Sequence, residues 1–392
     1  MRPRRQGDEP DGASPVRTWL QARWQALGHV LLPPRPEVQR LEPAPTNPIL
    51  APDQRHAWES KAVFNPAAVL IDDEVHLLYR AIGEQDRSSL GHATSKTGLD
   101  FSKPTEMPAY VAREAFEGHA HHVHAPHPGS YASGGGGWGG VEDPRVTQIG
   151  DRVYMTYVAY NGIDPPRVAL TSIRTSDFRA RRWTWAPPVL ISEPGVVNKN
   201  AVLFPEKVRD RFVMIHRVYP NILLDYLDDL DFDGKTRWLV GQHVIPPSTE
   251  GWDNHKVGAG PPPIKTHAGW LLICQGVGKE EGYRYKSGAM LLDLRRPERV
   301  LVRPKEPILE PDAWYTNQGW KAGVVYPCGA VVKNGHLLVY YGGADTYVCV
   351  ATAPFDAFVN SLARRRRPHM VLRPLGMFLD WTLPWRRSRA PV

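Results

Sequence analysis

A unit of about 60 residues recurs five times along this chain, and this repetition restricts the possible folds more than any other feature. Each unit contains short apolar runs of strand length, separated by turns rich in Asp, Asn and Gly. The units begin near Asn65, Asp143, Asn200, Pro262 and Tyr326. One small sheet cannot bury both of its faces, so successive units must stack. Five sheets in radial order predict an all-β, five-bladed β-propeller; a β-sandwich is the alternative, but it leaves the repeated order of turn and closing aromatic residue unexplained.

The segments on either side of the repeats have different patterns. Apolar residues from Val16 to Leu31 fall at helical spacing, which predicts an N-terminal amphipathic helix. We expect its apolar face to pack on the same chain, with a homo-oligomer contact as the alternative. A run of arginines, Arg364–Arg367, lies in a basic C-terminal stretch. The predicted division is therefore a tail and helix over 1–45, a propeller catalytic domain over 46–358 and a basic extension over 359–392.

The chain has a net charge of +7, so nucleic acid, membranes and anionic substrates are all candidate partners. Much of the excess lies in terminal basic runs, which are typical of solvated tails. A basic run without a binding fold is weak support for nucleic-acid binding, so we expect no nucleic-acid partner. No apolar run reaches the length of a membrane span, and we expect no membrane insertion.

Three cysteines, Cys274, Cys328 and Cys349, lie in apolar runs and form no CxxC pair. Their odd number and their spacing predict buried thiols in a reducing compartment. Residues 1–12 are polar and contain no apolar segment of the signal-peptide type. We therefore expect a cytoplasmic protein.

The most distinctive short motif is Gly139–Arg145, in which Glu142 and Asp143 stand next to each other before Pro144. The proline restricts its own φ and the backbone of Asp143, so a carboxylate can be held in one orientation. Two close carboxylates push their pKa values apart, and Arg145 can balance one of the charges. This arrangement suits a general acid. An ordinary Asp-Pro turn at the start of a strand is the alternative.

Polar residues recur at equivalent positions of the repeats, where core strands are expected to be apolar. The first strand of three units begins at Asn65, Asp143 and Asn200. The second strand of each unit ends at or near Arg80, Asn161, Arg217, Gln275 and Asp345. In antiparallel neighbours the start of one strand lies beside the end of the next, so these side chains should meet in one axial pocket. This convergence favours a catalytic Asp143 over a turn residue.

A histidine-rich insertion precedes the acid motif and contains His119, His121, His122, His124 and His127. Closely spaced histidines are one type of metal site. These lie among Gly and Pro residues, without a predicted helix or strand to hold the ligands in place. We therefore interpret the insertion as a polar lid, and we expect no metal ion in the site.

Several ordered motifs resemble those of glycoside hydrolase family 130, a family composed largely of inverting β-mannoside phosphorylases on five-bladed propellers. The motifs are Phe64–Ala67, Leu77–Ala81, Gly140–Arg145, Asn200–Lys207, His216–Arg217, Lys256–Thr266, Gly269–Ile273 and Tyr340–Asp345. They extend over residues 47–353. The resemblance implies a glycoside phosphorylase that uses inorganic phosphate as co-substrate and needs no other cofactor. Some members of the family are hydrolases, and related β-1,2-mannosyltransferases share the fold.

The resemblance also implies roles for residues that hold the sugar. Asp143 matches the general acid, whose proton reaches the glycosidic oxygen through a hydroxyl of the mannosyl unit. Asn65, Arg80 and Asp345 match residues that hold this unit. The complete set of substrate-binding candidates is Asn65, Arg80, Glu142, Arg145 and Asp345.

A second implied set contacts phosphate. Its members are Lys199, Asn200, Arg217, Gln275 and Tyr285. Lys199 stands where phosphorylases often have Arg, so the two-pronged hydrogen bonding of a guanidinium is lost there. Gln275 stands where the family usually has His, so it can donate a hydrogen bond but brings no charge.

The expected reaction is reversible, inverting phosphorolysis of a β-linked mannoside of the mannobiose, mannooligosaccharide or mannosyl-glucose type. It yields α-mannose 1-phosphate and a shortened acceptor. Such a reaction needs one acid and an anion pocket, because phosphate is already an anionic nucleophile, whereas an inverting hydrolase needs a second carboxylate. Glu206 is the candidate base for a β-mannoside hydrolase, although an ion pair with Lys207 or Arg217 is the favoured explanation for it.

Two other activities remain as alternatives. A β-mannosyltransferase would need room for a nucleotide sugar, and no motif for one is present. A non-catalytic carbohydrate-binding propeller would use exposed aromatic side chains to stack on sugar faces. The candidates are Trp252, Trp314, Tyr315 and Trp320, which can equally fill the interfaces between blades.

Overall fold

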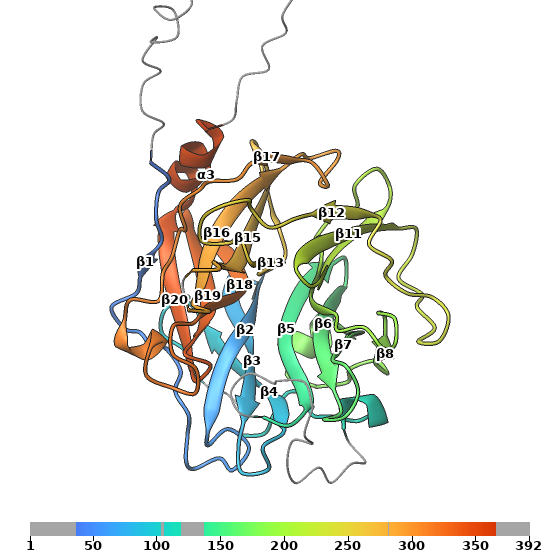
Figure 1. Cartoon of the computed structure of the whole chain (residues 1–392). Helices are drawn as coiled ribbons and strands as arrows, with labels where there is room; N and C mark the ends of the chain where they lie inside the picture. The colour runs from blue at the N-terminus through green and yellow to red at the C-terminus, as the bar shows by residue number, and fades with distance from the viewer. Residues whose placement is uncertain (1–36, 103–105, 119–136, 281, 366–392) are drawn as a thin grey trace, which may run out of the picture. The chain divides into compact units, whose positions relative to one another are not determined.

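The computed structural model describes residues 37–102, 106–118, 137–280 and 282–365 (Figure 1). From Val38 onward these residues belong to one compact unit. The helix predicted within residues 16–31, the histidines of the insertion and the extension beyond residue 365 lie outside the described residues.

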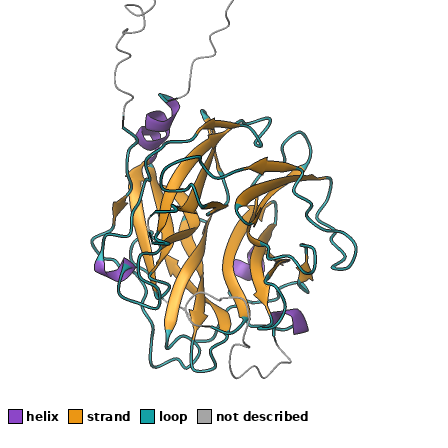
Figure 2. Cartoon of the chain, viewed as in Figure 1, coloured by secondary structure: helices purple, strands orange, loops and turns teal. Residues whose placement is uncertain are grey.

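Five groups of antiparallel strands follow one another along the compact unit, which confirms the predicted five-bladed β-propeller (Figure 1, Figure 2). The first two blades are joined into one seven-stranded sheet by a single parallel pairing of Ser88 with Gly140. Blade one contains β2 (Ala62–Ile71), β3 (Glu74–Ile82) and β4 (Ser88–Ser95); blade two contains β5 (Gly140–Ile149), β6 (Arg152–Tyr160), β7 (Arg167–Arg174) and β8 (Val189–Leu190). Blade three contains β9 (Lys199–Leu203), β10 (Phe212–Val218), β11 (Asn221–Leu227) and β12 (His243–Ile245). Blade four contains β13 (Lys256–Ala259), β14 (Ile264–Thr266), β15 (Gly269–Val277), β16 (Tyr285–Leu292) and β17 (Val300–Val302). Blade five contains β18 (Val325–Lys333), β19 (His336–Gly343) and β20 (Tyr347–Pro354).

A short strand from before the first repeat completes blade five. Strand β1 (Glu42–Pro43) pairs antiparallel with β20, with Glu42 opposite Thr352 and Pro43 opposite Ala351. The beginning and the end of the unit therefore share one sheet, so the ring of blades is closed by hydrogen bonds as well as by packing. The strand lies N-terminal to residue 46, where the predicted propeller domain begins.

The core lies between neighbouring blades. In β19, Leu337 and Val339 pack against blade four, whereas Leu338 and Tyr340 pack against blade one. Successive side chains of a strand point to opposite faces, and here both faces are covered by another blade. A separate cluster of buried side chains fills each of the five interfaces. The strands are therefore continuous apolar runs in the sequence, without polar alternation.

Blade four begins earlier in the chain than the sequence pattern indicates. The repeat pattern places its first strand at Pro262–Lys265, but the inner edge of the sheet is formed by β13, which starts at Lys256. Both β13 and β14 pair with β15, and Gly260–Pro263 interrupt them. Proline has no N–H for the ladder, so the inner strand is divided in two and its first half is hidden from a periodicity search.

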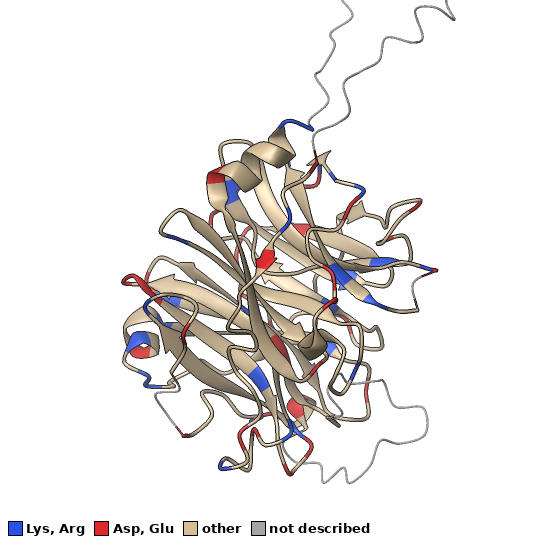
Figure 3. Ribbon diagram, turned by 90° about the vertical axis from the view of Figure 1, so that its left-hand side faces the viewer, with Lys and Arg blue, Asp and Glu red and all other residues tan. Residues whose placement is uncertain are grey.

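The described residues contain two α-helices, α2 (Thr175–Arg179) and α3 (Phe355–Ala363), and strands make up most of the fold (Figure 2). Neither helix is long and apolar enough to cross a membrane. Cys274, Cys328 and Cys349 are buried and unbridged, as predicted. Acidic and basic residues are interspersed over the loops of the unit in the view of Figure 3.

Candidate active site

Three inner strands carry a polar residue in a left-handed backbone conformation. These residues are Asn65 in β2, Asp143 in β5 and Asn200 in β9, with φ values of 49°, 49° and 57°. Asn and Asp adopt this conformation more readily than most other residues. Each of the three strands also shifts register against its neighbour at this point, as in a β-bulge. The bulges interrupt the alternation of buried side chains at equivalent points of three blades.

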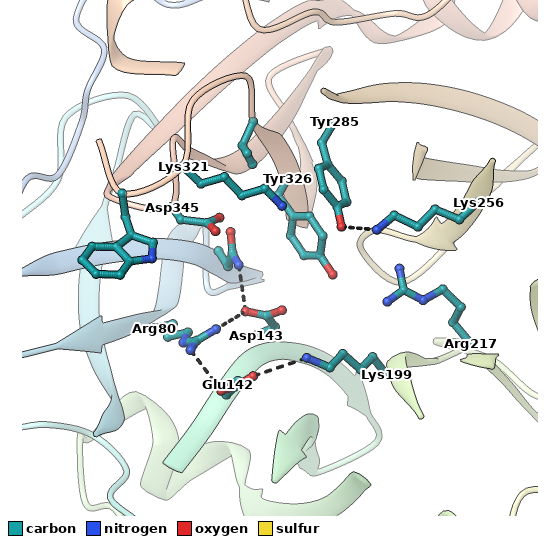
Figure 4. Close-up of a pocket in the computed structure, with 13 residues that line it drawn as sticks. Arg80, Glu142, Asp143, Lys199, Arg217, Lys256, Tyr285, Lys321, Tyr326 and Asp345 are labelled. Atoms are coloured by element: carbon teal, nitrogen blue, oxygen red, sulfur yellow. Dashed lines mark hydrogen bonds and ion pairs between the residues drawn. The ribbon is translucent and has the colours of Figure 1, made fainter. Parts of the chain in front are cut away.

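The side chains of all five blades meet in one cavity of about 530 Å³ (Figure 4). Most of the residues that line it are polar or charged. They are Asn65, Arg80, Glu142, Asp143, Lys199, Arg217, Lys256, Tyr285, Trp320, Lys321, Val324, Tyr326 and Asp345. Eight of the predicted site residues are among them, so the repeat-equivalent positions converge on one cavity.

Asp143 is held by a cluster of hydrogen bonds. Its Oδ1 accepts from Asn65 Nδ2 at 2.7 Å and from Arg80 Nη1 at 3.2 Å. Arg80 also donates to Glu142 Oε1 at 3.1 Å and to Ser88 Oγ at 2.9 Å. Arg80 is only 1% exposed, so one buried guanidinium bridges two adjacent carboxylates. Such charge-assisted hydrogen bonds fix the Asp143 carboxylate in one orientation.

The charges around Asp143 do not act as the sequence suggests. Burial raises the pKa of its carboxyl group, but the charges of Arg80 and Arg145 outweigh burial and hold that pKa below its ordinary value. From the sequence we expected that the two adjacent carboxylates, Glu142 and Asp143, would push their pKa values apart, an arrangement that suits a general acid. The nearby cations prevail, so Asp143 is ionised at neutral pH in this arrangement, and a ligand must change the charge balance before it can donate a proton.

Three cationic side chains gather in another part of the cavity: Lys199, Arg217 and Lys256 (Figure 4). Burial, and then the charges of Arg217 and Lys199, lowers the pKa of Lys256 to about 8. Lys256 Nζ donates to the hydroxyl of Tyr285 at 2.6 Å. Arg217 has no hydrogen-bond or ion-pair partner for its guanidinium among the described residues. Like charges held this close form a site suited to an anion.

A glycine allows two further predicted phosphate contacts to approach this group. A methyl group added to Gly258 would lie 2.8 Å from Asn200 Oδ1, 2.9 Å from Gln275 Nε2 and 3.3 Å from Arg217 Cδ. Neither Asn200 nor Gln275 lines the cavity itself; Gln275 Nε2 donates to the carbonyl oxygen of Ala259 at 3.0 Å. The two amides therefore lie directly behind the cations.

Arg145 also lies behind the cavity surface. Its Nη1 donates to the main-chain oxygen of Asp143 at 2.9 Å, and its Nε donates to the oxygen of Gly260 at 3.3 Å. It is 2% exposed. Arg145 therefore supports the backbone of Asp143 and connects blade two with blade four.

Several residues considered from the sequence lie elsewhere. Asn161 follows β6 and bonds to Asp164 on the surface, outside the cavity. Glu206 is exposed and forms an ion pair with Lys265, and not with the predicted partners Lys207 or Arg217. Glu206 is therefore not placed to act as a base.

The four candidate stacking aromatics separate into two groups. Trp252 and Tyr315 are buried between blades three and four and between blades four and five, respectively. Trp314 is half-exposed and does not line the cavity. Trp320 is 67% exposed and lines the cavity, so only this ring is placed to meet a sugar there.

Three polar lining residues were not assigned to the site from the sequence: Lys256, Lys321 and Tyr326. Lys256 occupies the first position of β13, the equivalent of Lys199 in β9, but the divided strand concealed this correspondence. Tyr326 starts the fifth repeat and could have been found by the same comparison. Lys321 lies in a loop before β18 that has no counterpart in other repeats, so no sequence signal identified it.

One group of possible metal ligands occurs among the described residues, formed by Asp53, His56 and Glu59. Asp53 already pairs with Arg55, and Glu59 accepts a hydrogen bond from Tyr79 at 2.8 Å. None of the three lines the cavity. The histidines of the insertion lie outside the described residues.

Comparison with known proteins finds that this chain is similar to mannoside phosphorylases. A model of glycosyl hydrolase family 130, described as beta-1,4-mannooligosaccharide phosphorylase, matches residues 40–364. A 1,2-beta-oligomannan phosphorylase from Thermoanaerobacter sp. is 36% identical over 314 residues, which cover 78% of this chain and 94% of that protein. A beta-1,2-mannobiose phosphorylase from the same organism is 34% identical over 325 residues, covering 80% and 96%.

A solved structure has the same fold. It is the beta-1,2-mannobiose phosphorylase of Listeria innocua in complex with beta-1,2-mannobiose, which is 24% identical in sequence. The two structures superpose with a TM-score of 0.63 over 82% of this chain and 99% of the other. At this level of identity the likeness concerns the fold.

Proposed function

This chain belongs to glycoside hydrolase family 130, and from that premise we propose that it is a glycoside phosphorylase that cleaves a β-linked mannoside with inorganic phosphate. The products are α-mannose 1-phosphate and an acceptor shortened by one mannosyl unit. The observation that carries the proposal is the division of one cavity between an oriented carboxylate, Asp143, and three cations, Lys199, Arg217 and Lys256. An acid and an anion site in one cavity are what phosphorolysis requires.

In this proposal the mannosyl unit lies on the side of the cavity formed by Asn65, Arg80 and Asp345. Asp143 supplies a proton toward the glycosidic oxygen through a hydroxyl of that unit. Phosphate bound by the cations attacks the anomeric carbon from the opposite face, so the β-linkage becomes an α-phosphate. No general base is needed, because the nucleophile carries its own charge.

Phosphate binding also supplies the change in charge that Asp143 needs. Lys199 is one of the cations that lower the pKa of Asp143. A bound phosphate anion offsets the positive charge of Lys199, and its own negative charge disfavours the Asp143 carboxylate. The pKa of Asp143 therefore rises when phosphate is present, and the proton donor forms only when the nucleophile is in place.

A hydrolytic reaction has less support because the other carboxylates already have cationic neighbours. Glu142 lies 3.1 Å from Arg80 Nη2 and 3.7 Å from Lys199 Nζ. The negative charge of Asp345 stabilises the cationic form of Arg80, and both residues lie on the side assigned to the sugar. Glu206 lies outside the cavity and pairs with Lys265. A carboxylate placed to activate water is not found among the described residues that line the site.

The β-1,2 linkage is the first to test, because two relatives that match most of this chain are named for β-1,2-linked mannans. The experiment incubates the purified protein with β-1,2- and β-1,4-mannobiose, with and without inorganic phosphate. We expect mannose 1-phosphate only when phosphate is present, and its α configuration can be read by NMR. Release of free mannose at equal rates in both conditions would contradict the proposal and indicate a hydrolase.

A further inference from the structure

The hydroxyl group of Tyr326 has no place in the reaction described so far, although it lies inside the cavity. Tyr326 is 8% exposed and comes from β18, the inner strand of blade five. In Figure 4 its hydroxyl points to the space between Asp143 and the guanidinium of Arg217. This space separates the side assigned to the sugar from the side assigned to phosphate.

The hydrogen bonds around this hydroxyl leave its proton available. Its oxygen accepts a hydrogen bond from Asn200 Nδ2 at 2.5 Å. The guanidinium of Arg145 lies 5.7 Å from the ring centroid, but a guanidinium has no lone pair that could accept the proton. Among the described residues no acceptor receives the proton of Tyr326. A phenol that accepts on one side and has no acceptor elsewhere can donate to a ligand in the cavity.

We propose that the Tyr326 hydroxyl donates a hydrogen bond to an oxygen of the phosphate group, at the point where phosphate meets the anomeric carbon. The inference rests on the proposed function and adds a phosphate-binding residue that contributes no charge. Burial, and then the charge of Asp143, raises the pKa of Tyr326 well above its ordinary value although Arg145 and Arg217 oppose the shift, so the phenol keeps its proton. The ring is fixed by Tyr285, whose centroid lies 5.7 Å away at an interplanar angle of 62°.

The test is a calorimetric titration of inorganic phosphate into the wild-type protein and into Tyr326→Phe. This substitution keeps the ring and removes only the hydroxyl. The hydrogen bond to the charged phosphate contributes to the binding free energy, and its loss should weaken phosphate affinity about tenfold. The KM for phosphate in mannobiose phosphorolysis should rise by a similar factor. Unchanged phosphate affinity in Tyr326→Phe would overturn the inference.

Tyr340→Phe is the matched control. Tyr340 is also buried, and its hydroxyl donates to the oxygen of Gly98 at 2.9 Å, in the interface between blades five and one. Phosphate affinity should be unchanged in this variant. Melting temperatures of all variants, measured in parallel, show whether each one is folded.

A double-mutant cycle with Asn200→Ala separates a direct contact from a supporting role. If Tyr326 donates to phosphate itself, Tyr326→Phe weakens binding about tenfold in the Asn200→Ala background as well. If Tyr326 acts only by holding Asn200, the second substitution has no further effect and the inference is wrong. Failure of the proposed function has a different signature, since the wild-type protein would then bind no phosphate.

Discussion

At the residue scale, the site depends on a few side chains that leave the regular pattern of the strands. Asn65, Asp143 and Asn200 adopt positive φ values in strands that are otherwise regular. A non-glycine residue in this conformation is strained by about 1 kcal/mol or more, so packing must impose it. This conformation directs an amide or a carboxylate toward the cavity at the same point of three blades. A regular strand, in which side chains alternate between the two faces of the sheet, would not direct them there.

Asp143→Asn tests the proton donor. The amide retains the size of the side chain and can still accept from Asn65, but it cannot donate a proton to the leaving oxygen. We expect kcat for phosphorolysis to fall about 10²- to 10⁴-fold, which is the usual contribution of a general acid. Asp177→Asn, in α2 and outside the cavity, is the control and should keep wild-type kcat. Activity retained in Asp143→Asn would reject the assignment of the acid.

Lys256 should make phosphate binding depend on pH. Its pKa of about 8 in the free protein means that the cation is present below pH 8 and is lost as pH rises above it. We therefore expect the KM for phosphate to rise between about pH 7.5 and pH 9, the range in which a group with a pKa of about 8 loses its proton. In Lys256→Met, KM should already be high at pH 7 and should rise less steeply.

The same measurements on Lys207→Met provide the control, because Lys207 lies over the ring of Phe212, outside the cavity. Its pH profile should match that of the wild-type protein. An equally steep alkaline rise in Lys256→Met would assign the titration to another group.

At the scale of elements, the interface between blades one and two contains an unusual pair of buried histidines. His76 Nδ1 and His92 Nε2 lie 3.1 Å apart, and each residue is 1% exposed. Burial lowers the pKa of both rings, that of His92 to about 3, and the charge of Glu74 opposes the shift in His76. Phe178 of α2 packs against both rings at centroid distances of 5.5 and 5.9 Å. The pair is therefore neutral in the folded protein at ordinary pH.

This pair should make the fold sensitive to acid. Below about pH 6.5 the unfolded chain binds protons at these histidines more readily than the folded chain does, so the free energy of unfolding falls as pH falls toward 3. His92→Gln keeps a hydrogen-bonding group that cannot be protonated. It should reduce the slope of unfolding free energy against pH by up to about 1.4 kcal/mol per pH unit between pH 6 and pH 4.

Urea unfolding at a series of pH values measures this slope. His336→Gln, at an exposed residue on β19, is the matched control and should retain the wild-type slope. If His92→Gln also retains it, the histidine pair does not account for acid sensitivity.

At the scale of the whole compact unit, the ring of blades is completed by a segment from outside the repeats. Strand β1 pairs with β20, and Val38 and Leu41 are buried in the interface between blades four and five. Asn47 adds two hydrogen bonds to the main chain of Val350, at 2.8 and 2.9 Å. The predicted domain boundaries, the cytoplasmic location, the absence of a nucleic-acid partner and the homo-oligomer contact stay predictions.

Truncation tests this closure. A chain that starts at residue 46 lacks β1 together with Val38 and Leu41. The loss of two buried side chains should lower the free energy of unfolding by roughly 3–6 kcal/mol, in addition to the lost strand pairing. A chain that starts at Val38 keeps all of these contacts and should unfold as the full chain does. Equal denaturant midpoints for the two truncations would show that β1 is dispensable.

The number of blades, the class of fold and most of the site could be predicted from the sequence. Repetition, turn residues and apolar runs are local features, and equivalent positions in repeated units must meet at one rim. Eight predicted residues line the cavity for this reason. Arg145, Asn200 and Gln275, also predicted for the site, lie directly behind the surface of the cavity and do not line it.

Only the tertiary structure decided how charge is distributed within the site. The lowered pKa of Asp143 results from Arg80 and Arg145, and that of Lys256 from burial and from cations of blade three. The placement of Lys256 and Lys321 depends on a divided strand and on a loop without counterpart in the other repeats. These pKa shifts and positions depend on distances between residues that are far apart in the chain, and no local sequence pattern encodes such distances.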